Sequence, residues 1–243
     1  MGLAMGPAMA ERARGDAGDI AEAERIRAYF ERDAERFDRI YAGANRSPIQ
    51  RLVDRLFRSA MLRRRAEAIC SFVEDGETCL EVGSGSGRIA VPLALKRNAQ
   101  VIGIDLAPAM VERAEALARD AGAAGRCRFY QGDFMSFAPD RPVDVVVAAG
   151  VVDYLADPLP LLRRAAGMAR RALIVTYPHK HRLLNIARWL WLSGIKRCPV
   201  YFYSDADIDR LAAALGATVG ALHKSGRWPL VEETVARIDL PAR

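Results

Sequence analysis

Residues 79–87 read CLEVGSGSG: an apolar run, one acidic residue, and three glycines at alternate positions. The apolar run is typical of a buried strand, and the following GRIAVPLALKR is typical of a helix. In such a strand–turn–helix unit, the strand ends at the sheet edge where ligands bind. Glycines let the backbone turn tightly there and approach a ligand closely. We therefore predict a cofactor site at this turn, with an empty glycine-rich turn as the simpler alternative.

The residues that follow this turn alternate between strand and helix patterns. Near-continuous apolar strands separated by helices are typical of a parallel sheet covered on both faces. The expected strands are 78–82, 100–105, 127–133, 143–149 and 172–177, and the expected helices are 87–97, 108–121 and 158–170. The sequence therefore predicts an α/β fold, Rossmann-like and doubly wound.

The C-terminal part breaks this alternation. Ser204 and Asp207 form a capping-box pattern at the start of a helix, DADIDRLAAALG. Two strands, 217–223 and 229–237, are expected after it, joined by a turn at Gly226. A hairpin at the end of a parallel sheet gives a mixed sheet.

Composition narrows the class of protein. The chain has 243 residues, 51% hydrophobic and 27% charged, which suits one globular domain with an added lobe. Its net charge of +6 comes from arginines spread over helices, so solvated helix faces explain the charge better than a nucleic-acid partner does. No N-P-P-Y motif follows the expected fourth strand, where the chain reads AAGVVDY, and we expect no nucleic-acid partner.

The four cysteines are scattered, with no C-x-x-C pair and no His/Cys cluster at ligand spacing. We therefore expect neither a disulfide framework nor a metal site, and a reducing compartment fits. The N-terminus lacks a signal-peptide pattern and no apolar stretch is long enough to span a bilayer, so a cytoplasmic location is expected.

The residues at the turn discriminate between cofactors. A dinucleotide fingerprint needs a glycine at position 88, where this chain has Arg88. Glu81, two residues before the first glycine, suits a cationic group and would repel a pyrophosphate. S-adenosylmethionine carries a sulfonium and an ammonium and no phosphate, so this chemistry favours it over NAD.

Two further acids follow expected strands. Asp105 lies about twenty residues after the turn and can accept hydrogen bonds from both ribose hydroxyls of either cofactor, or cap the helix 108–121. Asp133, beside Phe134 in YQGDF, suits an adenine amino group, with a simple Asx turn as the alternative.

The motifs EVGSGSG, GIDLAPAMVERA, QGDF and VDVVVAAGVVDYLADP resemble, in order and spacing, the class I S-adenosylmethionine-dependent methyltransferases. FDRIYAG and CPVYFYSDADIDRLAAALG are similar to the bacterial small-molecule type, with the Mg-protoporphyrin O-methyltransferase subgroup nearest. The resemblance implies a seven-stranded, mostly parallel sheet with an antiparallel last strand. It also implies that Glu81 and the glycines hold the methionine end, Asp105 the ribose, and Asp133 with Phe134 the adenine.

We accordingly expect these residues to bind the cofactor: Glu81, Gly83, Ser84, Gly85, Gly87, Asp105, Leu106, Met110, Gly132, Asp133, Phe134, Ala149, Gly150, and Tyr29 and Tyr41 from the N-terminal helix.

Candidate catalytic groups follow the fourth and fifth strands. The methyl donor is already activated, so an enzyme mainly aligns the acceptor and excludes water. A phenol acceptor benefits from a base, whereas a carboxylate needs none. We expect His179 or His181 to assist deprotonation, with Tyr154 as a further candidate, although a loop histidine is often simply solvated.

The expected organisation is a flexible tail over 1–18, a helical cap over 19–74 and a methyltransferase domain over 75–243. Residues 178–203 form an insertion that is interpreted as a substrate lid, and its apolar face over 183–195 allows peripheral membrane contact or core packing instead.

The expected reaction is methyl transfer to an O or N atom of a small, partly apolar molecule such as a tetrapyrrole, a polyketide or another secondary metabolite. An NAD-dependent oxidoreductase and a non-catalytic S-adenosylmethionine-binding scaffold remain the alternatives.

Overall fold

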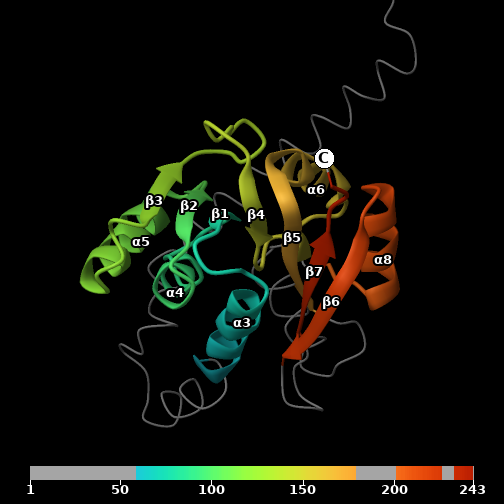
Figure 1. The fold of residues 1–243 in the computed structure, drawn as a ribbon, viewed down its shortest axis with the longest axis horizontal. Coiled ribbons are helices and arrows are strands. Elements are labelled where there is room, and N and C mark those ends of the chain that lie inside the picture. Colours follow the sequence, from blue (N-terminus) through green and yellow to red (C-terminus); the bar gives the residue numbers. More distant parts are fainter. Residues whose placement is uncertain (1–58, 179–200, 226–232, 243) are drawn as a thin grey trace, which may run out of the picture.

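The computed structural model describes residues 59–178, 201–225 and 233–242 (Figure 1). The expected tail over 1–18, most of the cap over 19–74 and most of the insertion over 178–203 lie outside these residues.

The described strands form one mixed sheet in the order β3-β2-β1-β4-β5-β7-β6 (Figure 1). Strands β1 to β5 pair in parallel, and β7 pairs antiparallel with both β5 and β6. The strands are β1 Thr78–Val82, β2 Gln100–Asp105, β3 Cys127–Gln131, β4 Val143–Ala148, β5 Ala169–Pro178, β6 Thr218–Ser225 and β7 Glu233–Asp239. The predicted doubly wound fold with a terminal hairpin is confirmed.

Helices cover both faces of the sheet, as the near-continuous apolar strands predict. They are α3 Ser59–Ser71, α4 Ala90–Lys96, α5 Pro108–Asp120, α6 Leu159–Met168 and α8 Asp205–Ala214, with a 3-10 turn, η2, at Val152–Tyr154. Helices α3, α4 and α5 share one buried apolar cluster with Cys79 of β1. Helices α6 and α8 share the other, with Leu80 of β1. Alternate residues of one strand thus enter opposite cores.

Several element boundaries differ from the sequence prediction by a few residues, and two of these differences have a clear structural reason. Helix α4 begins at Ala90 and not at Gly87, because Gly87 still belongs to the turn, where its N–H donates to the Ser84 carbonyl. Strand β5 begins at Ala169, because Arg170 and Arg171 lie in the strand and pair with acidic residues of neighbouring segments.

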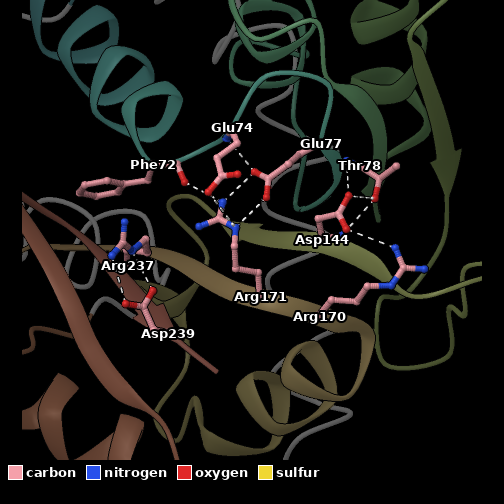
Figure 2. A network of polar contacts seen from close by, with 9 residues as sticks. All are labelled: Phe72, Glu74, Glu77, Thr78, Asp144, Arg170, Arg171, Arg237 and Asp239. Atoms are coloured by element: carbon pink, nitrogen blue, oxygen red, sulfur yellow. Dashed lines mark hydrogen bonds and ion pairs between the residues drawn. The ribbon is translucent and has the colours of Figure 1, made fainter. Parts of the chain in front are cut away.

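Figure 2 shows these pairs at the edge of the sheet where β1, β4 and β5 begin. Arg171 donates to both carboxylate oxygens of Glu77, at 2.6 and 2.7 Å, and to the Phe72 carbonyl at 2.9 Å. Asp144 accepts from the Thr78 N–H and hydroxyl and pairs with Arg170. This network closes the edge opposite to the one where the strands end.

Parallel strands place the ends of β1, β2, β3 and β4 at one edge of the sheet. The chain runs outward from β1 to β3 and then returns to β4 on the other side of β1. A ligand in such a fold binds outside the strand ends at this change of direction. The CLEVGSGSG segment ends β1 at this position. Within the described ranges, no helix combines the length and apolar character needed to cross a membrane.

Candidate functional site

The glycine-rich turn after β1 depends on its glycines for two reasons. Gly83, Gly85 and Gly87 have φ angles of +65°, +50° and +79°, which side-chain-bearing residues rarely adopt. A Cβ on Gly83 would lie 2.8 Å from Val151 Cγ2, and one on Gly87 would lie 3.2 Å from the Ala114 backbone. Gly85 differs, since no atom of the described residues lies within 4 Å of the Cβ position. The described part of the chain therefore leaves the space beside Gly85 open to a ligand.

Ser84 anchors the turn to the neighbouring strand. Its N–H donates to the Ile104 carbonyl at 3.0 Å, and its side chain is buried. The absence of a side chain at Gly103 makes room for it, since a Cβ there would lie 2.8 Å from Ser84 Cβ and 2.5 Å from the Phe129 ring. Gly103 is a structural requirement of the turn that the sequence pattern did not single out.

Glu81 presents a buried carboxyl group directly below the turn. It is 2% exposed, and its Oε2 has no hydrogen-bond partner among the described residues. Burial raises the pKa of Glu81 well above its usual value, the Ala90 N–H opposes this, and nearby Asp105 adds to it. A buried carboxyl oxygen without a partner is costly, and a cationic donor would supply the missing hydrogen bond.

Asp105, at the end of β2, holds two backbone segments together. Its Oδ2 accepts from the Gly85 N–H at 2.8 Å and its Oδ1 from the Ala107 N–H at 2.9 Å. Burial raises the pKa of Asp105, and these two hydrogen bonds oppose the shift. Asp105 does not cap α5, because Ala107 is the N-cap residue and makes no side-chain cap bond. The capping alternative is therefore wrong.

The segment after β3 lies beside this carboxylate. The Gly132 N–H donates to the Asp105 carbonyl at 2.9 Å. The exposed Asp133 accepts from the Met135 N–H at 2.9 Å, which is the Asx turn considered as an alternative. Phe134 is 5% exposed and packs in the core beneath. The Asx turn fixes the Asp133 side chain, and adenine binding by Asp133 stays a prediction.

The loop after β4 completes this edge. Gly150 has a φ of +71° and donates its N–H to Thr176 Oγ1 at 2.8 Å, while Ala149 before it is half-buried. Tyr154 is buried at the end of η2. Leu106 is half-buried, and Met110 packs against Ala107 at the start of α5.

Arg65 of α3 is a neighbour of this loop that the sequence pattern missed. Its Nη1 lies 3.3 Å from the position of a Cβ on Gly150. Its guanidinium pairs with Glu233 of β7 at 2.5 and 2.8 Å. Since 168 positions separate the pair, only the tertiary fold reveals it.

Comparison with known proteins shows which family contains the residues of this sheet edge. The sequence model of the family described as "Methyltransferase domain" matches residues 73–188, which contain the turn, Glu81, Asp105, Asp133 and the β4 loop. Residues 73–188 belong to the methyltransferase domain family. The resemblance inferred from EVGSGSG and the later motifs is confirmed at this level.

Curated relatives of this chain include two proteins named as methyltransferases of small molecules. Ajmaline N-methyltransferase from Rauvolfia serpentina is 30% identical over 136 residues, covering 53% of this chain and 47% of that protein. The 27-O-demethylrifamycin SV methyltransferase from Amycolatopsis mediterranei is 33% identical over 121 residues, covering 49% and 40%. The chain thus matches less than half the length of these relatives.

Among solved structures, magnesium protoporphyrin IX methyltransferase from Synechocystis PCC 6803, with bound SAH, superposes with a TM-score of 0.72. The match covers 89% of this chain and 98% of that one at 19% sequence identity. It confirms the fold of the methyltransferase domain.

Several predicted site residues lie outside the described part of the chain. These are His179, His181, Tyr29 and Tyr41, together with the apolar face over 183–195. The structure brings together the predicted cofactor residues of β1, β2, β3 and β4, and the predicted bases stay predictions.

Proposed function

We propose that this protein transfers a methyl group from S-adenosylmethionine to an O or N atom of a small, partly apolar molecule. The observation that carries the proposal is the Glu81 carboxyl, which is buried at the strand edge and whose Oε2 has no hydrogen-bond partner in the described part of the chain. The α-ammonium of the methionine moiety supplies the cationic donor that this oxygen lacks. The pyrophosphate of NAD would instead place negative charge beside Glu81 and Asp105.

The remaining cofactor contacts follow from the positions of the side chains. Gly85 offers its backbone to the methionine end, since a Cβ there would have no neighbour within 4 Å among the residues that the structure describes. Asp105 uses its remaining lone pairs for the ribose hydroxyls, and Asp133 with Phe134 receives the adenine. Leu106, Met110, Gly132, Ala149 and Gly150 line the same edge in this proposal, with Tyr29 and Tyr41 closing over it.

The chemistry requires little from the protein beyond alignment. Bound S-adenosylmethionine supplies an activated methyl group on a sulfonium. The protein holds the acceptor lone pair in line with that methyl group and keeps water out. His179 or His181, or Tyr154, takes the proton of a hydroxyl acceptor, whereas a carboxylate acceptor has no proton to lose.

The acceptor is proposed to bind between the helical cap over 19–74 and the lid over 178–203. The two relatives and the structural neighbour are named for ajmaline, 27-O-demethylrifamycin SV and magnesium protoporphyrin IX. We therefore propose a small, partly apolar molecule as the acceptor, with protoporphyrins screened first. Residues 183–195 would bring the lid to a membrane surface that holds such an acceptor.

Calorimetric titration with S-adenosylmethionine, S-adenosylhomocysteine and NAD tests the proposal. We expect micromolar binding of the first two and none of NAD, and loss of binding in Asp105→Ala. A sharper pair is Gly85→Ala against Gly122→Ala, because both glycines have positive φ and neither has a described neighbour within 4 Å of its Cβ position. Both variants should lose about 1 kcal/mol of stability, and only Gly85→Ala should lose binding. Binding of NAD alone would contradict the proposal, and binding without methyl transfer to any acceptor would identify a scaffold.

A further inference from the structure

The loop that follows β3 is built from two consecutive turns. Ser136 donates its N–H to the Asp133 carbonyl at 3.0 Å, and Phe137 donates its N–H to the Phe134 carbonyl at 3.2 Å. The Phe137 ring also lies 5.6 Å from the ring of Tyr130 in β3, centroid to centroid. The direction of the Asp133 side chain therefore depends on the direction of the peptides around it.

Arg164 of α6 reaches this loop from the next structural unit of the chain. Its Nε donates to the Phe134 carbonyl at 3.0 Å and its Nη2 to the Phe137 carbonyl at 2.6 Å. The guanidinium is planar, so two donors in one rigid plane fix both carbonyls relative to each other. A lysine, with a compact ammonium on a flexible stem, cannot reproduce this geometry.

Helix α6 itself is firmly placed, because Leu162 and Ala165 are 1% exposed in the core beside Phe134. The contacts of Arg164 thus fix the loop after β3 relative to the packed helix α6. Arg163, its neighbour in sequence, is exposed on the same helix. The chain therefore offers a matched pair of arginines that differ in this contact.

We propose that Arg164 is a positioning residue for adenine recognition: by clamping the Phe134 and Phe137 carbonyls it holds the Asp133 carboxylate toward the adenine amino group. The inference rests on the proposed function, in which Asp133 receives the adenine. A carboxylate accepts from the amino group of adenine, but it repels the carbonyl oxygen that hypoxanthine carries at the same position. Arg164 would therefore set the preference for adenine as well as the affinity.

The test compares the dissociation constants of S-adenosylhomocysteine and S-inosylhomocysteine by calorimetry. We expect the wild-type protein to prefer the adenosyl compound by at least roughly tenfold, since a wrong oxygen meets a carboxylate. Arg164→Met should bring the ratio of the two constants toward one. Arg163→Met should leave the ratio unchanged.

Arg164→Lys keeps the charge and reaches one carbonyl, so its ratio should lie between those of the wild type and Arg164→Met. This variant also serves if Arg164→Met does not fold. If Arg164 had only a structural role, its variants would lower both affinities equally or would lower the melting temperature alone. A ratio of the two dissociation constants that is unchanged in both Arg164 variants would overturn the inference. If the wild type binds neither compound, the proposed function fails instead.

Discussion

In the proposed function, Glu81 serves ligand binding at the expense of stability. The carboxyl group lies in the core face that Cys79 also enters, and Oε2 has no hydrogen-bond partner among the described residues. Folding alone would favour an uncharged side chain there, whereas a cationic ligand favours the carboxylate. Burial raises the pKa of Glu81 well above its usual value, and the nearby Asp105 carboxylate adds to this shift.

The variant Glu81→Gln tests whether the Glu81 carboxylate lowers stability while it raises affinity for the ligand. The folded pKa of Glu81 lies above the unfolded value of 4.5, so the folded state binds the Glu81 proton more tightly than the unfolded state does. The resulting contribution to the free energy of unfolding is fully present below pH 4.5 and is lost as the pH rises through the folded pKa. Without ligand, we therefore expect Glu81→Gln to melt at or above the wild-type temperature at pH 8. Its affinity for S-adenosylmethionine should fall about 10- to 100-fold.

Thermal unfolding from pH 4.5 to 8 and calorimetry measure the two effects. The control is Glu112→Gln on the exposed side of α5, which should change neither quantity. A Glu81→Gln protein that melts well below the wild type at pH 8 would contradict the interpretation of an uncompensated buried charge.

Helix α8 shows how a local element is specified. Ser204 and Asp207 make a reciprocal capping box: Asp207 N–H donates to Ser204 Oγ at 3.2 Å, and Ser204 N–H donates to Asp207 Oδ2 at 2.8 Å. These contacts satisfy backbone groups that a helix leaves without partners. The helix then packs Ile208 and Ala212 against the sheet.

Ser204→Ala should destabilise the protein by about 1 kcal/mol at pH 7, because the first turn of α8 loses its cap. The Ser204 hydroxyl and N–H lower the pKa of Asp207, so this stabilisation is present above pH 3.8 and is lost as the pH falls through the folded pKa. The difference from the wild type should therefore shrink in acid. Melting temperatures at pH 7 and below pH 3.8 measure it. Asp209→Asn, on the exposed side of α8, should show no such dependence on pH.

At the scale of the whole molecule, the edge where the parallel strands end differs in its polar groups from the edge where they begin. The edge where the strands end carries glycines with positive φ and the buried carboxyl group of Glu81, an arrangement that serves a ligand in the proposed function. The edge where β1, β4 and β5 begin carries the ion pairs and hydrogen bonds of Arg171, Glu77 and Asp144 (Figure 2). Polar groups there are paired with each other, which serves stability.

Arg171→Met should therefore lower the free energy of unfolding by about 2 kcal/mol, because it takes two donors away from Glu77, whose side chain is 11% exposed. Affinity for S-adenosylmethionine should stay within twofold of the wild type. Arg170→Met is the matched control, since the Arg170 side chain is 53% exposed and its loss should cost less than 1 kcal/mol. Urea unfolding and calorimetry give the two quantities, and a parallel loss of affinity would show that the edges are coupled.

Features that depend on neighbours in sequence were predictable from the sequence alone. The alternation of apolar strands and helices predicted the sheet, the pattern from Ser204 to Asp207 predicted the start of α8, and CLEVGSGSG predicted the glycine turn at the end of β1. Each of these follows from local hydrogen bonding or from side-chain periodicity, which act over a few residues. The family resemblance rests on the same local motifs.

Contacts between distant segments were decided only by the tertiary structure. Nothing in the sequence indicates that Arg65 pairs with Glu233, that Arg164 clamps the loop after β3, or that Gly103 makes room for Ser84. Nor does the sequence show that Glu81 keeps an oxygen without a partner among the described residues, since this depends on which groups surround it. Such features arise from the packing of strands and helices far apart in the chain, and long-range packing leaves no local pattern to read.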